Sequence, residues 1–172
     1  MKKIILVVGA SGVGKDTLLR FARKKLKKEI NFVRRYITRK PDKNEKNFFV
    51  DSSAFKILQD SNFFISSWSA HDNLYGIAKS SIKDGVNVIS ISRKEVEHFE
   101  KIYDDVCTIN IIVPKKILEA RLVARGRETA EEIEQRLLRN CVDVKAKKIV
   151  EFENTLELSV SVEIFSKLLS DI

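Results

Sequence analysis

A glycine-rich segment near the N-terminus contains the residues best suited to hold a phosphate. It reads Gly9-Ala10-Ser11-Gly12-Val13-Gly14-Lys15 and directly follows the apolar residues 3–8. Its glycines let successive backbone N–H groups turn inward around an anion, and the helix pattern that follows adds a favourable dipole. A glycine-rich turn that merely happened to carry a lysine would lack this strand-before, helix-after context. We therefore predict a phosphate-binding loop in which Lys15 reaches the β- and γ-phosphates of a nucleotide.

Asp16 stands where the phosphate-loop pattern has Ser or Thr, whose hydroxyl binds Mg²⁺. A carboxylate is a good oxygen ligand for this hard cation, either directly or through water. Thr17 offers a hydroxyl one position later, although it faces a different direction on the helix. We predict that the chain binds ATP with Mg²⁺, that residues 9–17 contact the nucleotide, and that Asp16 holds the metal.

The elements that must position this loop alternate between short β-branched runs and longer helical periods. This alternation indicates an α/β fold with a mostly parallel sheet flanked by helices, within one domain spanning 1–172. The predicted strands are 3–8, 31–38, 87–92, 107–113 and 149–153. The predicted helices are 17–28, 93–101, one opened by Pro114, 129–141 and 160–169. The third of these begins at a proline, and the fourth begins with a capping box at 129–132.

Residues 39–77 differ in composition from the rest, with polar turns and short aromatic runs, and we expect them to form a small subdomain over the sheet.

The longest apolar run, 4–8, is far shorter than the ~20 residues that cross a bilayer. It leads into the glycine loop rather than a cleavage site, so we predict neither a membrane span nor a signal peptide. Cys107 and Cys141 are too few for a disulfide framework and have no metal-ligand spacing. We interpret them as small apolar residues of a cytoplasmic protein.

The chain carries a net charge of +8, from 32 basic and 24 acidic residues. A basic surface suggests nucleic acid, but the run at 23–28 lies near a helix end, where cations favour the dipole, and no aromatics interleave with it. A site for a multiply phosphorylated small molecule would account for part of the excess. We therefore predict no nucleic-acid partner; a homodimer remains an open alternative.

Several separated motifs resemble those of the guanylate kinase family of nucleoside monophosphate kinases. They are the loop, Ile37-Thr38-Arg39-Lys40-Pro41, Trp68, Tyr75-Gly76, Arg121-Leu122-Val123-Ala124-Arg125-Gly126, Arg136 and Asn154. The resemblance implies a phosphate-loop kinase fold with a lid at about 125–140 and an acceptor-binding subdomain at about 39–77. It implies that Arg39 and Tyr75 hold the acceptor's phosphate and that Asn154 lies at the nucleotide site. It also implies that Arg125 and Arg136 close over the transferring phosphoryl group, where such arginines stabilise transition-state charge.

Departures from that family concern the acceptor. A second phosphate-holding arginine is replaced by Asp42 and a tyrosine by Asn47, and the base-reading positions become Arg35, Ser67 and Ile77. A site without a carboxylate for the guanine N–H groups should discriminate poorly for guanine. Guanylate kinase activity is therefore disfavoured.

Five further matches resemble the ribose 1,5-bisphosphate phosphokinases. They are Gly14-Lys15-Asp16, Arg35-Tyr36-Ile37-Thr38-Arg39, Ser67 to His71 before Tyr75-Gly76, Ser92-Arg93 and Gly126-Arg127-Glu128. This resemblance implies ATP-dependent phosphorylation of ribose 1,5-bisphosphate, a sugar phosphate of phosphonate breakdown, to 5-phosphoribosyl 1-diphosphate. The alternatives are a guanylate or related nucleotide kinase and, third, a non-catalytic guanylate-kinase-like module; the intact Gly14 and Lys15 argue against the module.

Two further residues are candidates for acceptor binding. His71 lies in the acceptor segment beside Tyr75 and could donate to a sugar hydroxyl or phosphate, although a lone histidine is often structural. Arg93 could hold an acceptor phosphate or cap a strand end, and we favour the first. His98 is interpreted as a surface residue and Trp68 as packing. A solvated basic face is the alternative for the lid arginines, and we prefer it for Arg139 alone.

Overall fold

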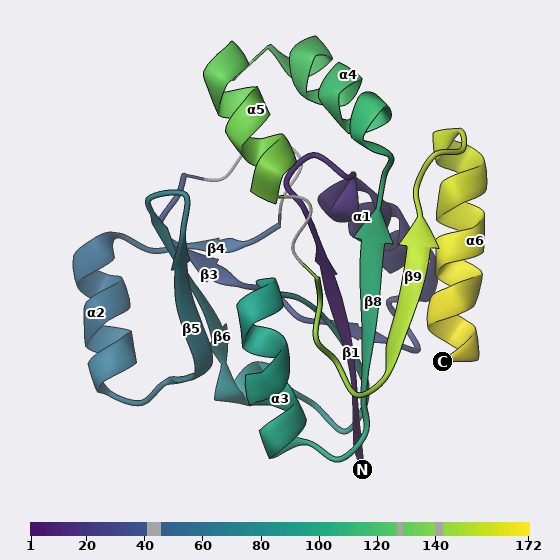
Figure 1. Cartoon of the computed structure of the whole chain (residues 1–172). Coiled ribbons are helices and arrows are strands. Elements are labelled where there is room, and N and C mark those ends of the chain that lie inside the picture. The colour runs from purple at the N-terminus through teal and green to yellow at the C-terminus, as the bar shows by residue number, and fades with distance from the viewer. Residues whose placement is uncertain (41–45, 127–128, 140–142) are drawn as a thin grey trace.

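A five-stranded parallel sheet in the order β2-β7-β1-β8-β9 runs through the centre of the computed structural model, which describes residues 1–40, 46–126, 129–139 and 143–172 (Figure 1). Its strands are β1 (Lys2–Gly9), β2 (Asn31–Phe32), β7 (Gly85–Ser90), β8 (Val106–Ile112) and β9 (Ile149–Glu153). β1 lies between β7 and β8 and pairs in parallel with both. The predicted α/β fold with a mostly parallel sheet is confirmed.

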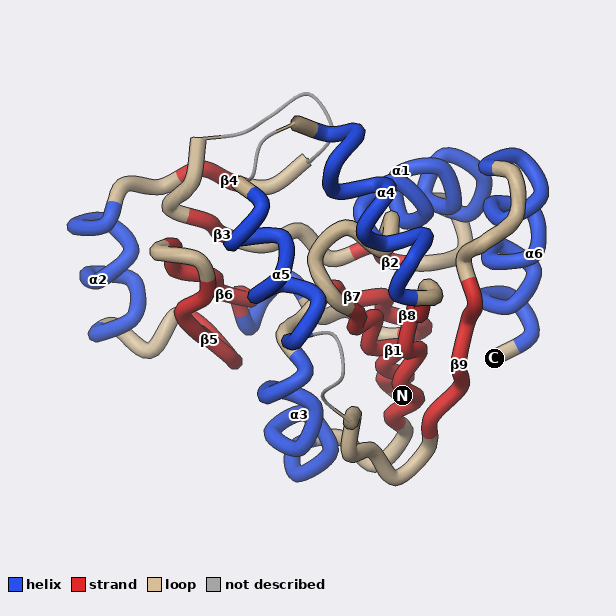
Figure 2. Tube along the Cα trace, turned by 45° about the horizontal axis from the view of Figure 1, so that its top comes forward, coloured by secondary structure: helices blue, strands red, loops and turns tan. Residues whose placement is uncertain are grey.

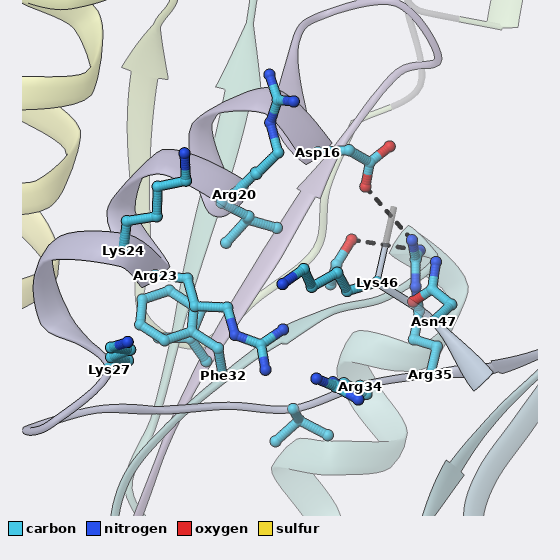
Figure 3. Close-up of a pocket in the computed structure, with 14 residues that line it drawn as sticks. Asp16, Arg20, Arg23, Lys24, Lys27, Phe32, Arg34, Arg35, Lys46 and Asn47 are labelled. Carbon is cyan, nitrogen blue, oxygen red and sulfur yellow. Dashed lines mark hydrogen bonds and ion pairs between the residues drawn. The ribbon is translucent and has the colours of Figure 1, made fainter. Parts of the chain in front are cut away.

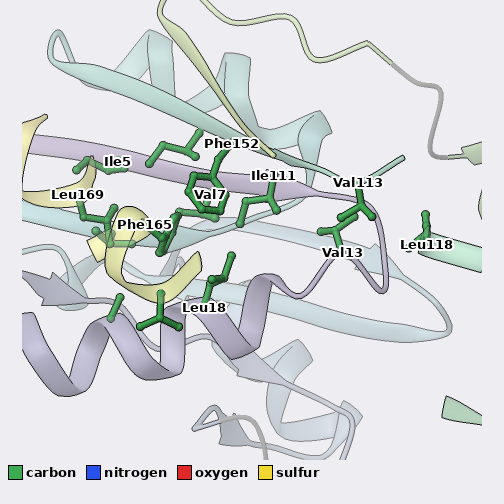
Figure 4. Packing of buried hydrophobic residues seen from close by; sticks show 14 of the residues in the cluster. Ile5, Val7, Val13, Leu18, Ile111, Val113, Leu118, Phe152, Phe165 and Leu169 are labelled. Carbon is green, nitrogen blue, oxygen red and sulfur yellow. The ribbon is translucent and has the colours of Figure 1, made fainter. Parts of the chain in front are cut away.

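The sheet is buried on both faces, which explains why its central strand is continuously apolar. Side chains 4–8 of β1 are fully buried. On one face, the helices α1 (Lys15–Leu26) and α6 (Leu158–Asp171) cover Ile5, Val7, Ile109 and Ile111, with Phe165 among them (Figure 4). On the other face, α3 (Val96–Ile102) packs against the alternate positions of β1. Parallel strands require this double cover, because helical crossovers return the chain over the faces.

A second, four-stranded sheet in the order β4-β3-β6-β5 lies beside the first (Figure 2). It comprises β3 (Tyr36–Ile37), β4 (Phe48–Phe49), β5 (Phe64–Ala70) and β6 (Asn73–Ala78), with α2 (Ser52–Asp60) alongside β5. Aromatic rings form much of its interior, since Tyr36 contacts Phe48, Phe63 and Phe64. A Cβ at Gly76 would lie 2.6 Å from the Phe64 ring, so the glycine after Tyr75 lets that ring pack flat on β6.

The prediction of one strand over 31–38 was wrong. Asn31 and Phe32 pair with β7 in the parallel sheet, whereas Tyr36 and Ile37 pair with β6 in the second sheet. The backbone has to break between these pairs because the two halves satisfy their hydrogen bonds in different sheets. The break places Arg34 and Arg35 in the crossing between the sheets.

Side-chain bonds tie α3 and its leading turn to the second sheet. His98 Nε2 lies 2.8 Å from the Ile65 carbonyl of β5, and the Ser66 hydroxyl donates to Glu95 at 2.8 Å. His98 is nevertheless exposed, as predicted. The predicted helix over 93–101 is in fact a short 3₁₀ turn, Arg93–Glu95, followed by α3.

Two helices, α4 (Lys115–Arg125) and α5 (Ala130–Arg139), lie above the carboxyl ends of the parallel strands (Figure 1). Pro114 caps α4, as predicted. The predicted capping box before α5 is present: Thr129 N–H donates to Glu132 Oε2 at 2.8 Å, and Glu132 N–H donates to Thr129 Oγ1 at 3.3 Å. Arg125 ends α4 and Arg136 lies within α5, but both side chains lie outside the described part of the structure.

The described ranges contain no helix that could span a membrane, and their cysteine, Cys107, is buried. None of their helices is long and apolar enough to cross a bilayer. Cys107 is fully buried in β8, and its burial raises the pKa of the thiol, so the group behaves as the small apolar residue that the sequence predicted. Cys141 lies outside the described residues.

A buried asparagine joins the start of β7 to two neighbouring segments. The Asn87 amide group donates to the carbonyls of Lys83 at 2.8 Å, Gly85 at 3.0 Å and Lys3 at 3.4 Å. Its Oδ1 accepts from Lys83 N–H at 2.9 Å and from Asn31 Nδ2 at 2.7 Å. Asn87 is fully buried, so each bond it loses leaves a polar group without water to replace it.

We expect Asn87→Ala to lower the free energy of unfolding by about 3 kcal/mol, measured by urea denaturation. Asn31→Ala, which removes one of these bonds from a half-buried position, is the matched control and should cost about 1 kcal/mol. Equal losses in the two variants would contradict a central role for Asn87.

Candidate active site

The glycine loop between β1 and α1 adopts a backbone that glycine permits most readily. Gly12 and Gly14 have φ of 95° and 92°, in the left-handed region that side chains rarely adopt. Gly14 caps α1, whose first residue is Lys15, so the helix begins two residues earlier than predicted. The Lys15 ammonium reaches back across the loop and donates to the Gly9 carbonyl at 3.1 Å. N–H groups, helix dipole and ammonium thus meet where a phosphate would bind.

Two side chains from distant segments bond to the backbone of this loop. Asn154 follows β9, is buried, and donates through Nδ2 to the Val13 carbonyl at 2.7 Å. Arg121 of α4 donates to the same carbonyl at 3.4 Å and to the Asn154 carbonyl at 2.8 Å. A Cβ at Gly14 would lie 2.5 Å from Asn154 Nδ2, so the loop and the amide are in close contact.

Arg121 is a loop-supporting residue that the sequence analysis did not single out, although the Arg-Leu motif contains it. Asn154 was predicted to lie at the nucleotide site, and the structure places it behind the loop, where it supports the loop's shape. Direct contact of Asn154 with a nucleotide stays a prediction.

Arg35 is the centre of the polar contacts beside the loop. Its side chain is only 11% exposed, and its guanidinium donates to Asp16 Oδ1 at 3.3 Å and to the Ser90 hydroxyl at 3.4 Å. The same guanidinium lies 5.7 Å from the centre of the Tyr75 ring. The structure therefore brings together the predicted metal ligand, Asp16, and a predicted acceptor residue, Tyr75, with Arg35 between them.

Tyr75 is held rigidly in this position. It is buried in β6, opposite Ile37 of β3, and its ring stacks on Trp68 with centroids 5.5 Å apart and planes 6° apart. Trp68 therefore packs as predicted.

The other predicted acceptor residues lie in three separate segments of the chain. Arg39 is exposed just after β3, where Thr38 exchanges two hydrogen bonds with Leu74 at the start of β6. His71 is exposed in the β5–β6 turn with φ of 50°. Arg93 is half-buried in the turn after β7. Their contact with an acceptor stays a prediction.

The metal site predicted at Asp16 can be compared with the side-chain ligands that the structure offers. Among residues 1–40, 46–126, 129–139 and 143–172, no three His, Cys, Asp or Glu side chains gather into a ligand set. Mg²⁺ does not need such a set, because it is commonly held by one or two carboxylates, waters and the phosphates of its nucleotide. Asp16, in the first turn of α1 beside the loop, suits that mode of binding, and a carboxylate can accept from Arg35 while it ligates a metal.

A basic cavity of about 230 Å³ extends from Asp16 along α1 (Figure 3). Its polar lining comes from α1 and its C-cap, from the crossing after β2, from the segment before β4 and from the end of β7: Asp16, Arg20, Arg23, Lys24, Lys27, Arg34, Arg35, Lys46, Asn47 and Ser90. The sequence analysis interpreted the run at 23–28 as cations near a helix end, where they favour the dipole. The spacing of positions 16, 20, 23, 24 and 27, which places them on one helix face, was a signal that could have revealed the cavity.

Together, the parallel sheet, the glycine loop at the start of α1 and the second sheet beside it define a phosphate-loop kinase. The chain belongs to the guanylate kinase family, since the model of that family, "Guanylate kinase", matches residues 1–168.

Within this family the chain is similar to proteins named ribose 1,5-bisphosphate phosphokinase PhnN. It is 40% identical to the one from Acidiphilium cryptum, over 90% of this chain and 86% of that protein. It is 36% identical to the one from Burkholderia mallei, over 81% of this chain and 78% of that protein. The solved guanylate kinase of Anaplasma phagocytophilum superposes with a TM-score of 0.67 and 18% identity over 99% of this chain and 85% of that one, which supports the fold alone.

We expect Asn154→Ala to weaken nucleotide binding about tenfold, because the Val13 carbonyl loses its buried donor and the loop loses its support. Calorimetric titration with ADP measures this, and a thermal melt verifies that the variant is folded. Asn73→Ala, in the β5–β6 hairpin away from the loop, is the matched control. Unchanged ADP affinity in Asn154→Ala would contradict the supporting role.

Proposed function

We propose that this kinase transfers the γ-phosphoryl group of ATP to the 1-phosphate of ribose 1,5-bisphosphate, giving 5-phosphoribosyl 1-diphosphate and ADP. The observation that carries the proposal is Arg35, which bonds to Asp16 and Ser90 and lies over Tyr75. A largely buried cation at a position matched to the base-reading residues of guanylate kinases suits an anionic acceptor rather than guanine. The names of the relatives in this family agree with that chemistry.

The reaction needs no nucleophile from the protein. An ionised oxygen of the acceptor's 1-phosphate attacks the γ-phosphorus in line, a new P–O bond forms, and the bond to the β–γ bridging oxygen breaks to release ADP. Catalysis therefore depends on positioning and on charge stabilisation. Bound Mg²⁺ would supply Lewis-acid neutralisation of the β- and γ-phosphates.

The residues of this chain divide that work between the two substrates. The loop N–H groups and Lys15 hold the phosphates of ATP, and Asp16 holds the metal. Tyr75 and Arg39 orient the acceptor's 1-phosphate, with His71 and Arg93 as additional contacts. This division rests on the cluster around Arg35 and on the family's motifs.

The lid completes the proposed site. Arg125 and Arg136 lie on α4 and α5, above the carboxyl ends of the parallel strands, and we assign them to the transferring phosphoryl group when the lid closes. Closure of the lid at about 125–140 over the loop, and of the acceptor subdomain at about 39–77, would exclude water within one kinase domain spanning 1–172. The buried thiol of Cys107 is compatible with a cytoplasmic enzyme.

Turnover with defined acceptors tests the proposal. With Mg²⁺-ATP, we expect ADP release with ribose 1,5-bisphosphate and release at least 100-fold slower with guanosine monophosphate, because the site offers guanine no carboxylate at its base-reading positions. A reaction without acceptor measures background ATP hydrolysis. Faster turnover with guanosine monophosphate than with the sugar bisphosphate would overturn the proposal.

The role of Asp16 predicts a change in metal dependence. We expect Asp16→Ala to raise the Mg²⁺ concentration for half-maximal activity about tenfold or more, because one anionic ligand is lost. Calorimetric titration of ADP at several Mg²⁺ concentrations gives an independent readout. Asp16→Asn, which keeps an oxygen that can accept from Arg35, separates the loss of charge from the loss of that contact. An unchanged Mg²⁺ requirement in both variants would contradict metal binding by Asp16.

A further inference from the structure

The basic cavity along α1 is more cationic than the activity described so far requires. Seven of its lining residues are basic and one, Asp16, is acidic. That single carboxylate already bonds to Arg35. The other lining cations, farther along α1, in the crossing after β2 and before β4, face a cavity whose described walls contribute no further acid.

Two arginines meet across this cavity from different elements. Arg23 extends from α1, and Arg34 comes from the crossing between the two sheets (Figure 3). Partial burial, and in addition the positive charge of Arg34, lower the pKa of Arg23 below its usual value. Arg23 stays protonated at neutral pH, so the protein holds two like charges near each other at a cost. An anion between them would relieve that cost.

The cavity's walls strengthen any such interaction. Leu19, Phe32, Val33 and Val88 provide apolar lining beside the charged groups. Low-polarity surroundings reduce screening, so a charge pair formed here is stronger than one on the open surface. Arg34 also lies over the Phe48 ring, 5.3 Å from its centre, which restricts where its guanidinium can lie.

The volume of the cavity and the spacing of its arginines along α1 indicate which anion would fit. The volume of about 230 Å³ is below the ~300–1,000 Å³ of pockets for larger ligands. By helix rise, Arg20 lies ~6 Å and Arg23 ~10 Å along the axis from Asp16. A compact acceptor whose reacting phosphate lies near Asp16 would therefore direct its far end toward Arg20, Arg23 and Arg34.

We propose that the cavity along α1, with Arg23 and Arg34 as its principal cations, is the subsite for the acceptor's second phosphate, the 5-phosphate of a pentose 1,5-bisphosphate. This assignment rests on the proposed function and adds a specificity determinant to it. The enzyme recognises the acceptor by a second dianion at a fixed separation from the first, in place of a base. Acceptors with one phosphate lose the part of the binding energy that the cavity supplies.

Removing the Arg23 cation and removing the acceptor's 5-phosphate should each lower kcat/KM through the loss of the same contact. Their effects should therefore not add when both are removed. We expect Arg23→Gln to lower kcat/KM for ribose 1,5-bisphosphate about 10- to 100-fold, as expected for loss of a charge-assisted contact. The same variant should leave kcat/KM for ribose 1-phosphate, which lacks the 5-phosphate, within about twofold of the wild type. Arg23→Lys, which keeps the charge, should recover part of the loss.

Two further variants guard against indirect effects. Arg34→Gln tests the same phosphate from another element, should Arg23→Gln fail to fold. Lys28→Gln removes a charge from the same basic run at an exposed position outside the cavity. It should leave kcat/KM for both acceptors unchanged. Equal losses for both acceptors, or no loss for the bisphosphate, would overturn the subsite.

A binding measurement separates the subsite from the reaction. Ribose 5-phosphate, which carries only the second phosphate, is titrated calorimetrically into the wild type and into Arg23→Gln. If the wild type turns over none of the acceptors but binds ribose 5-phosphate, and Arg23→Gln does not, the subsite stands and the proposed reaction fails. If the wild type turns over the bisphosphate but Arg23→Gln binds ribose 5-phosphate as well as the wild type does, the reaction stands and the subsite fails.

Discussion

The carbonyl of Val13 joins three distant parts of the chain, and the geometry of the active site depends on it. A loop with three glycines at positive φ is entropically costly to order and has little stability of its own. The Asn154 amide and the Arg121 guanidinium both bond to this carbonyl, from the end of β9 and from α4. Because the contact is buried, its loss is not compensated by water. The shape of the loop therefore depends on the same residues that attach α4 to it.

A second constraint is electrostatic and links the first turn of α1 to the second sheet. Arg35 lies in the crossing between the sheets, with its guanidinium against Asp16 on one side and Tyr75 on another. The proposed metal ligand and the proposed acceptor residue are thus both in contact with one side chain. Movement of the second sheet relative to the first would alter both, which gives a physical reason for the bonds that tie α3 to β5.

The fold is shared with guanylate kinases, so the fold does not decide the acceptor. The side chains around the loop and along α1 carry the information about the acceptor. A planar base requires donors and acceptors in a fixed pattern, whereas a phosphate requires positive charge with restricted geometry. Arg35, Arg23 and Arg34 supply positive charge of this kind, which is why the proposals above assign a phosphorylated acceptor.

The sequence by itself determined the features whose causes lie within a few residues. The phosphate loop, the buried strand before it, the capping box at Thr129 and the helix opened by Pro114 depend on local backbone preferences and periodicity, and each was predicted. The parallel sheet followed from the alternation of strands and helices. The family's motifs indicated Asp16 and Tyr75, though not how close the two would lie.

The tertiary structure decided what depends on elements meeting across space. The strand predicted over 31–38 is divided because its two halves find partners in different sheets, and periodicity carries no information about partners. Arg121 reaches a carbonyl 108 positions away in the sequence, and Arg35 reaches Asp16 across 19. The basic face of α1 was visible as a charge run, but it becomes a cavity only because the crossing after β2 places Arg34 opposite Arg23. Ion pairs and cavities arise from the crossing of elements, and no local pattern specifies that crossing.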